Sequence, residues 1–352
     1  MMYNKYNTFN TARLLTFFCL ILIAACSKTG IEPVNIIEPT REIDTKAIQA
    51  YKSNLNNRYI SIGYIYGWGK SDASILMHTP DSLDIIVVKD GYQNITNAQA
   101  EDLSNVKALK ATKVLLGIDF NENIISPSDL ADTIATRRTR KQAELIAIGA
   151  TPAQINNELA KITTDAENWA KAIAIYEYNH LMKIADEQIQ KYKYDGISIL
   201  FPVTVGYLEE PINIFFQNLS SDYGVGKQYS LIIENPDAAF APSLERANWL
   251  VYNKQTPDYY LNYFTEDAAR FPDNKFIPSA NYVSETDADG FLDSETFSAS
   301  GILPRTLDIV NWKSSNKGGA AFYHIEKNYH DVAGNLTYVG LRKAIRQLQF
   351  SE

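Results

Sequence analysis

The ten residues Lys193-Tyr-Asp-Gly-Ile-Ser-Ile-Leu-Phe-Pro202 decide how the rest of this chain is interpreted. The apolar run after Asp-Gly has the length and composition of a buried β-strand. Side chains alternate along a strand, so Ile197 and Phe201 are expected on one face, against surrounding helices. Ser198 and Leu200 are expected on the other face, pointing into a barrel. A strand buried on both faces is typical of a parallel sheet covered by helices.

Seven further runs of this kind are separated by helical stretches. In chain order, all eight are Tyr59–Tyr66, Leu83–Val88, Lys113–Phe120, Gly196–Phe201, Tyr229–Glu234, Trp249–Tyr252, Phe276–Tyr282 and Ala320–Ile325. Strands that alternate with helices imply parallel βαβ units, and eight units predict a single-domain (β/α)₈ TIM barrel, an α/β fold. A doubly wound open sheet is the alternative, but no strand is followed by Gly-x-Gly-x-x-Gly or a Walker-type loop.

The interval between the third and fourth strands is long, about 75 residues. Helix starts are predicted at Ser128-Asp129 and at Thr151-Pro152, where a cap residue or a first-turn proline precedes helical spacing. A further long amphipathic helix is expected over Ala166–Tyr192. The basic run Arg137–Lys141 is interpreted as a solvated helix face, with a docking patch for acidic partners as the alternative.

The first 25 residues have the pattern of an export signal: Lys5 and Arg13, an apolar run of about a dozen residues, then small residues. That run is shorter than the ~20 residues that a spanning helix needs. Ile23-Ala-Ala-Cys26 resembles a bacterial lipobox, which predicts lipidation of Cys26. An ordinary signal or an anchor is the alternative. Residues 26–45 are interpreted as a lipidated cysteine with a flexible tether, and residues 46–352 as the barrel.

Cysteine usage and charge restrict the function further. The two cysteines, Cys19 and Cys26, both lie in the signal region, so no disulfide framework or cysteine nucleophile is expected in the mature chain. The formal net charge of −8 argues against a nucleic-acid partner, because nucleic-acid binding depends on neutralising phosphates with Lys and Arg. Tyrosine is abundant, at 22 residues, and suits the faces of sugars, although a tyrosine-rich core explains the number equally well.

Aligned on Asp195-Gly196, the fourth predicted strand resembles the Asp-Gly-x-Asp-x-Asp-x-Glu strand of glycoside hydrolase family 18. The second and third Asp positions hold Ser198 and Leu200, and the Glu position holds Pro202. Gly318–Tyr329 resembles the family's last strand, with its Gly-Gly before an apolar run. Pro80-Asp-Ser-Leu-Asp-Ile-Ile86 resembles the second strand of the endoglycosidase-like branch found in lipoproteins of gut Bacteroidetes.

The resemblance implies a barrel that has lost its catalysis. In family 18 the final Glu is the general acid, and the Asp two residues earlier orients the substrate's acetamide, which acts as the nucleophile. With Leu200 and Pro202 at those positions, no catalytic residue is expected. The competing interpretation is a generic buried strand, since Asp-Gly before an apolar run is common. Surviving acids near the mouth are candidates for a displaced general acid, although each is more simply an ordinary loop or strand-end acid: Asp119, Glu209, Glu210 and Glu234.

Side chains at the predicted strand ends are the candidates for ligand binding. Together they would form an aromatic and polar rim around the barrel mouth, a plausible sugar platform, with core packing as the alternative for each: Tyr66, Trp68, Asp119, Glu234, Tyr252, Asn253, Gln255, Tyr282 and Tyr323. His324, Glu326 and His330 do not have metal-ligand spacing, and Asp287–Glu295 is too short for a calcium loop. No metal site and no cofactor is predicted.

Three functions follow as hypotheses. The first is a non-catalytic glycan-binding lipoprotein of the outer membrane, exposed at the cell surface, that holds oligosaccharides containing N-acetylglucosamine, such as N-glycans, for a neighbouring uptake complex. The second is an active family 18 endo-β-N-acetylglucosaminidase with a displaced acid. The third is a structural or adhesion lipoprotein without a sugar site.

Overall fold

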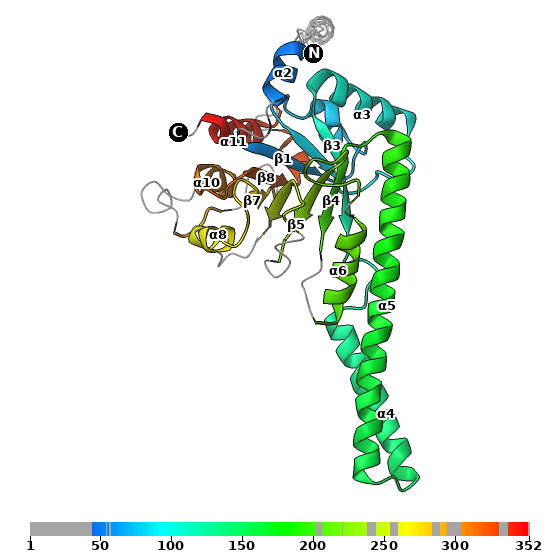
Figure 1. Ribbon diagram of the computed structural model, residues 1–352. Helices are drawn as coiled ribbons and strands as arrows, with labels where there is room; N and C mark the ends of the chain where they lie inside the picture. Colours follow the sequence, from blue (N-terminus) through cyan, green and yellow to red (C-terminus); the bar gives the residue numbers. More distant parts are fainter. Residues whose placement is uncertain are drawn as a thin grey trace, which may run out of the picture. The chain divides into compact units, whose positions relative to one another are not determined.

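A computed structural model describes most of the chain beyond residue 43 (Figure 1). The described residues are 44–53, 55, 58–201, 206–219, 221–237, 244–253, 260–283, 289–293, 304–330 and 337–350. They all belong to one compact unit, 44–352. The expected signal, Cys26, Pro202 and Gln255 lie outside the described residues.

Eight parallel strands close into a barrel in sequence order, which confirms the predicted (β/α)₈ fold. Each strand overlaps the run predicted for it. The strands are β1 (Ile60–Ile65), β2 (Ile85–Val88), β3 (Lys113–Asp119), β4 (Gly196–Leu200), β5 (Ser230–Glu234), β6 (Trp249–Tyr252), β7 (Phe276–Asn281) and β8 (Gly319–Tyr323).

The strands separate two apolar clusters by alternation. One fills the lumen and includes Ile62, Val87 and Ile232. The other lies between the strands and the helices and includes Ile197 and Phe201. The ring of Phe201 lies 5.5 Å from that of Phe215 on α6 (Glu209–Asn218). The predicted helix-facing side of β4 is therefore confirmed.

Asp195-Gly196 fastens the start of β4 to both neighbouring strands. The Asp195 carboxylate accepts a hydrogen bond from the Val114 backbone N–H at 2.9 Å and pairs with Lys107 at 2.9 Å. At Gly196 a Cβ would lie 2.0 Å from the Ser230 carbonyl oxygen, so the β4–β5 pairing requires glycine. The Asp-Gly pair is thus structural, and it lies at the end of the barrel opposite the mouth.

Helices cover the barrel, and short 3₁₀ turns join them to the strands. Besides α6, the described helices are α2 (Thr45–Lys52), α3 (Asn97–Lys110), α4 (Pro127–Ala147), α5 (Pro152–Tyr192), α8 (Leu261–Ala268), α10 (Arg305–Asn311) and α11 (Val339–Phe350). The described 3₁₀ turns are η2 (Asp72–Ser74), η3 (Leu76–His78), η4 (Gly206–Leu208) and η6 (Ile325–Asn328). No helix among these residues is both long and apolar enough to span a bilayer.

The long interval between β3 and β4 forms a helical hairpin. Both predicted helix starts are confirmed: Ser126 caps α4 ahead of Pro127, and Thr151 caps α5 ahead of Pro152. The separate helix expected from Ala166 is wrong, because α5 is one continuous helix of 41 residues. Nothing in the sequence between Pro152 and Ala166 breaks a helix. Figure 1 shows α4 and α5 side by side, extending beyond the end of the barrel where the strands finish.

Candidate functional site

A buried polar cluster fills the upper lumen of the barrel, with Glu234 at its centre. The Glu234 carboxylate is 1% exposed. It receives the Lys89 ammonium at 3.1 and 3.2 Å, the Ser198 hydroxyl at 2.8 Å and the Tyr323 hydroxyl at 2.8 Å. Tyr64 joins through its hydroxyl, which lies 3.2 Å from Ser198 Oγ. These five residues are called the lumen cluster below.

The two tyrosines of the lumen cluster form its wall. Their rings stack in parallel, with centroids 3.9 Å apart and planes 3° apart. Burial raises the pKa of both hydroxyls well above the ordinary value, and the nearby charge of Glu234 raises each further. Both hydroxyls therefore stay protonated at every physiological pH. The Tyr323 hydroxyl is then a permanent donor to Glu234.

Strand alternation and one glycine place the cluster. Tyr64, Ser198 and Glu234 continue the inward-facing positions of β1, β4 and β5, and Lys89 follows β2 two residues after inward-facing Val87. The Lys89 side chain reaches Glu234 past β3, where Gly117 leaves room. A Cβ at position 117 would lie 2.6 Å from the Lys89 side chain.

The lumen cluster compensates the charge of the buried Glu234 carboxylate. Both oxygens of Glu234 are engaged by donors, and an ammonium group compensates its charge. A general acid must instead offer a proton to the leaving group of a bound substrate. Ser198 and Leu200, the described residues at the expected catalytic positions of β4, carry no acidic group, and Leu200 is only partly buried.

A second group lies on the rim of the mouth, at the ends of β1 and β8. The ring of Tyr66 stacks on His324 with centroids 4.0 Å apart. Glu326 contacts both residues: one carboxylate oxygen lies 3.2 Å from His324 Nδ1, and the other accepts the Tyr66 backbone N–H at 3.2 Å. Burial raises the pKa of Tyr66, and so do nearby carboxylates, among them Glu234, Glu326 and Asp90. Tyr66 and His324 remain partly exposed.

Polar side chains continue the rim over β3, β6 and β7. Asp119 is partly exposed and accepts two hydrogen bonds from Asn121, at 2.8 and 2.9 Å. The Ser279 hydroxyl donates to the side-chain oxygen of Asn253 at 3.0 Å. The side-chain oxygen of Asn281, at the end of β7, is buried and accepts no hydrogen bond from any described residue.

Three of the predicted aromatic contacts lie elsewhere. Trp68 is 2% exposed in the helix-facing core, and its indole N–H donates to Asp102 at 2.9 Å. Tyr252 packs edge-on against Phe264 of α8, and Tyr282 is also buried in the helix-facing core. The expected ring of aromatics at the mouth is therefore wrong for these three residues. Tyr252 and Tyr282 occupy the outward-facing positions of their strands, and Trp68 folds back beneath α3.

Two members of the lumen cluster were not predicted. Tyr64 looked like one more apolar strand residue, although alternation from Ile60 and Ile62 places it in the lumen. Lys89 stands beyond the end of a strand, where a lysine is ordinarily exposed. In the sequence, only the position of Lys89 indicates the lumen, because it lies two residues after inward-facing Val87. Among the described residues, no three His, Cys, Asp or Glu side chains lie close enough together to hold a metal ion.

Comparison by sequence gives no relative. No protein-family model matches the chain, and no curated protein matches it significantly.

Comparison by structure finds similar proteins. The selenomethionine form of BT1044 with a glutamate-to-glutamine substitution superimposes with a TM-score of 0.60, at 14% identity, covering 87% of this chain and 93% of the other. The apo endo-β-N-acetylglucosaminidase of Cordyceps militaris gives a TM-score of 0.52 at 18% identity, covering 86% and 95%. The barrel is therefore similar in fold to these two proteins, which agrees with the resemblance to glycoside hydrolase family 18.

The family 18 likeness is one of fold alone at these identities. A family 18 chitinase from Pseudoalteromonas aurantia also matches, with a TM-score of 0.42 at 12% identity over 81% of this chain and 99% of the other, which is too loose to support an argument. The function of this family-18-like barrel therefore has to be argued from its own mouth and lumen.

Proposed function

We propose that this protein is a non-catalytic glycan-binding lipoprotein on a family-18-like barrel. It captures oligosaccharides that contain N-acetylglucosamine, such as N-glycans, for a neighbouring uptake complex. The lipid on Cys26 holds it to the bacterial outer membrane at the cell surface. The proposal that the protein is non-catalytic rests on the lumen cluster. The one buried carboxylate described in the lumen, Glu234, is bound by three side-chain donors.

The loss of catalysis follows from the positions where the family places its acids. General acid catalysis contributes about 10²–10⁴-fold to a reaction rate, and it requires a proton held within hydrogen-bond reach of the leaving group. On β4, the Ser198 hydroxyl donates a hydrogen bond to Glu234, and Leu200 has no acidic proton. Asp195 binds the backbone at the other end of the barrel.

Glycan binding is supported by what remains at the rim. The Tyr66–His324 stack offers partly exposed aromatic surface, which suits the C–H face of a sugar ring. Asp119 and Asn281 supply hydrogen-bonding groups on other strands. Few, well-placed polar groups around apolar surface are the usual composition of a small-ligand site. One structural neighbour is, by name, an endo-β-N-acetylglucosaminidase.

A glycan panel tested on one protein sample separates binding from hydrolysis. The full chain is expected to bind at least one oligosaccharide containing N-acetylglucosamine and to hydrolyse none, by glycan-array binding paired with product analysis. Tyr66→Ala should weaken binding at least tenfold. The matched control Tyr176→Ala, which removes a tyrosine that is 65% exposed on α5, should leave it unchanged. Turnover above background would refute the proposal.

Asp119 favours one alternative, an active hydrolase with a displaced acid. Asp119 is the last residue of β3, its position on the strand faces inward, and its carboxylate is partly exposed. Glu209 and Glu210 lie instead in the exposed first turn of α6, where Glu210 pairs with Lys171 at 3.1 Å. If the alternative holds, Asp119→Asn abolishes cleavage and leaves binding intact, whereas Glu210→Gln changes neither.

A further inference from the structure

A cavity of about 780 Å³ opens at the amino-terminal end of the barrel, opposite the mouth. Its wall is made by the segments that lead into β1, β6, β7 and β8 and by the last turn of α11. The volume falls within the range of small-ligand sites, about 300–1,000 Å³. Barrel enzymes use the other end for chemistry, so this cavity is independent of the candidate site at the mouth.

The lining of the cavity is cationic, although the chain as a whole carries a formal net charge of −8. Arg58, Lys275 and Lys317 line it together with one carboxylate, Asp273. Arg58 is neutralised by Asp84, at 2.5 and 3.0 Å. The positive charge that the cavity offers to a ligand therefore depends on its two lysines, Lys275 and Lys317.

Both lysines donate hydrogen bonds to backbone carbonyl oxygens, and the Lys317 ammonium also lies 4.9 Å from the centre of the Tyr59 ring. The Lys317 ammonium donates to the carbonyls of Val310 and Trp312 at 2.8 and 2.6 Å, and that of Lys275 donates to the Glu245 carbonyl. Neither ammonium lies within ion-pair distance of a carboxylate among the described residues. Burial lowers the pKa of both lysines, that of Lys317 to about 7, and the nearby charge of Glu245 opposes this shift at Lys275.

The two lysines also lie on neighbouring segments. Lys317 pairs with Phe276 in an isolated parallel bridge, so Lys275 and Lys317 lead side by side into β7 and β8. The aromatic side chains of Tyr59 and Trp249 line the same cavity. Asn248 adds an amide: its side-chain oxygen accepts the Leu231 N–H at 2.8 Å, which leaves its amide N–H groups as donors.

We propose that this cavity binds a phosphate-bearing ligand. A phosphate ester carries about −1.5 to −2 charges and three strong acceptor oxygens, which suit two lysine side chains and an amide donor. Its negative charge would also favour the protonated form of Lys317. The aromatic wall accommodates the carbon skeleton attached to the phosphate.

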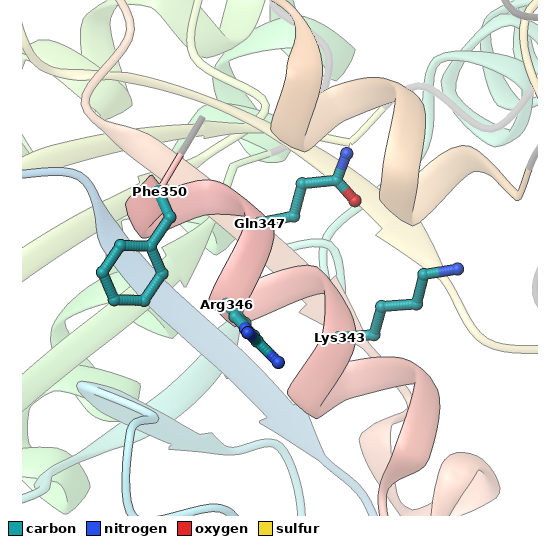
Figure 2. Close-up of a pocket in the computed structure, with 4 residues that line it drawn as sticks. All are labelled: Lys343, Arg346, Gln347 and Phe350. Atoms are coloured by element: carbon teal, nitrogen blue, oxygen red, sulfur yellow. The ribbon is translucent and has the colours of Figure 1, made fainter. Parts of the chain in front are cut away.

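The phosphate has two possible sources, a lipid headgroup and a free phosphate ester. The end of the barrel that holds the cavity is also where α2 attaches: Lys52 donates to the Leu83 carbonyl and the Thr112 hydroxyl, each at 2.6 Å, just before β2 and β3. Figure 2 shows a second pocket on α11, lined by Lys343, Arg346, Gln347 and by Phe350, which is 78% exposed. Cationic and apolar groups together suit a lipid surface.

Calorimetric titration of the full chain with glycerol 3-phosphate and with inorganic phosphate tests the site. Lys275→Gln should weaken glycerol 3-phosphate at least tenfold, because one of the two charges is lost. Lys70→Gln removes a charge from an exposed lysine after β1, at the mouth end, and should change nothing. Since Lys317 binds the end of α10, a Lys317 variant can misfold. Slower amide exchange over residues 310–318 with phosphate bound is therefore the second readout.

Vesicles of phosphatidylcholine with and without phosphatidic acid separate the two sources. Displacement of glycerol 3-phosphate from the cavity by phosphatidic acid vesicles alone assigns the site to a headgroup. Retention of the soluble ligand assigns it to a free ester. Equal affinity of Lys275→Gln and the unaltered chain for glycerol 3-phosphate, or no heat and no exchange protection with either phosphate compound, would overturn the proposal.

Discussion

Lys89 and Glu234 meet across the lumen beside Ser198, at one of the positions where the resemblance to family 18 leads one to expect an aspartate. Taking both charges out of water is costly, and only a close pair with further hydrogen bonds offsets that cost. Here Ser198 and Tyr323 supply those bonds. The arrangement is therefore stable as a set, and each member depends on the others.

The dependence predicts a non-additive loss of stability. Lys89→Met leaves the Glu234 carboxylate buried without its counter-charge and should lower the free energy of unfolding by about 3–5 kcal/mol. Adding Glu234→Gln to that variant should restore most of the loss, because the uncompensated charge is then gone. Urea denaturation of the full chain measures both. Lys70→Met, at a lysine 76% exposed, is the control. A single variant as stable as the control would contradict the account.

At the residue scale, the sequence predicts which face of a strand a side chain occupies better than it predicts which residue that side chain contacts. Alternation along β4 correctly assigned Ser198 to the lumen, because the two-residue period is local. That Ser198 donates to Glu234, 36 positions later, depends on barrel closure, which no local pattern encodes. The same limit explains Lys89, whose direction depends on the space left by Gly117.

At the scale of elements, the α4–α5 hairpin is the largest addition to the barrel. Ala166, Ala170 and Ala174 recur at four-residue spacing and are all buried along α5. Small side chains at this spacing let two helices approach closely. The base of the hairpin is held by Leu130 and Ala170 and by Tyr207, beside the start of α6. Figure 1 shows its far end away from the other helices and strands that the structure describes, so its stability there depends on local interactions.

The cap of α5 is the local interaction that can be tested most cleanly. The Thr151 hydroxyl accepts the Gln154 backbone N–H, and the Gln154 side chain accepts the Thr151 backbone N–H at 2.9 Å. Thr151→Ala should cost about 1 kcal/mol of local stability. Amide exchange over residues 152–157 should accelerate roughly fivefold, while exchange in β4 stays unchanged. Thr164→Ala, inside α5, is the control. Equal exchange in both variants would rule out a capping role.

The sequence predicts which strands and helices exist, but it predicts less well where one long helix continues without a break. All eight strands follow from short apolar runs bounded by polar segments. The helix starts at Pro127 and Pro152 follow from their caps. The break expected before Ala166 has no counterpart in the backbone. Ala166 and Ala170 still pack with Leu130 of α4, and α5 reaches the barrel core only from Ala174 onward without leaving the helical conformation.

At the scale of the whole molecule, buried lysines give the barrel an unusual dependence on pH. Burial lowers the pKa of Lys52 and of Lys317 to about 7, whereas an unfolded lysine titrates near 10.4. Between these values the unfolded chain binds more protons than the folded chain. Stability therefore rises with pH across this range.

The expected profile has its maximum near pH 10. From pH 7 to 10 each of the two lysines should add at most about 1.4 kcal/mol per pH unit to the free energy of unfolding. Above pH 10 stability should fall, because burial raises the pKa of residues such as Tyr64 and Tyr194 in the folded state, and unfolded tyrosines ionise first. Denaturation midpoints at successive pH values measure this. Lys52→Met should flatten the rise, and a flat profile in the unaltered chain would contradict it.

The Ser198–Glu234 contact also bears on how such a barrel can change over evolutionary time. An aspartate at position 198 would set a second carboxylate where the hydroxyl now lies, 2.8 Å from Glu234. Two like charges would then share one ammonium group, so this single substitution would be destabilising by itself. An acidic residue can enter the lumen at position 198 only if the partners of Glu234 change with it.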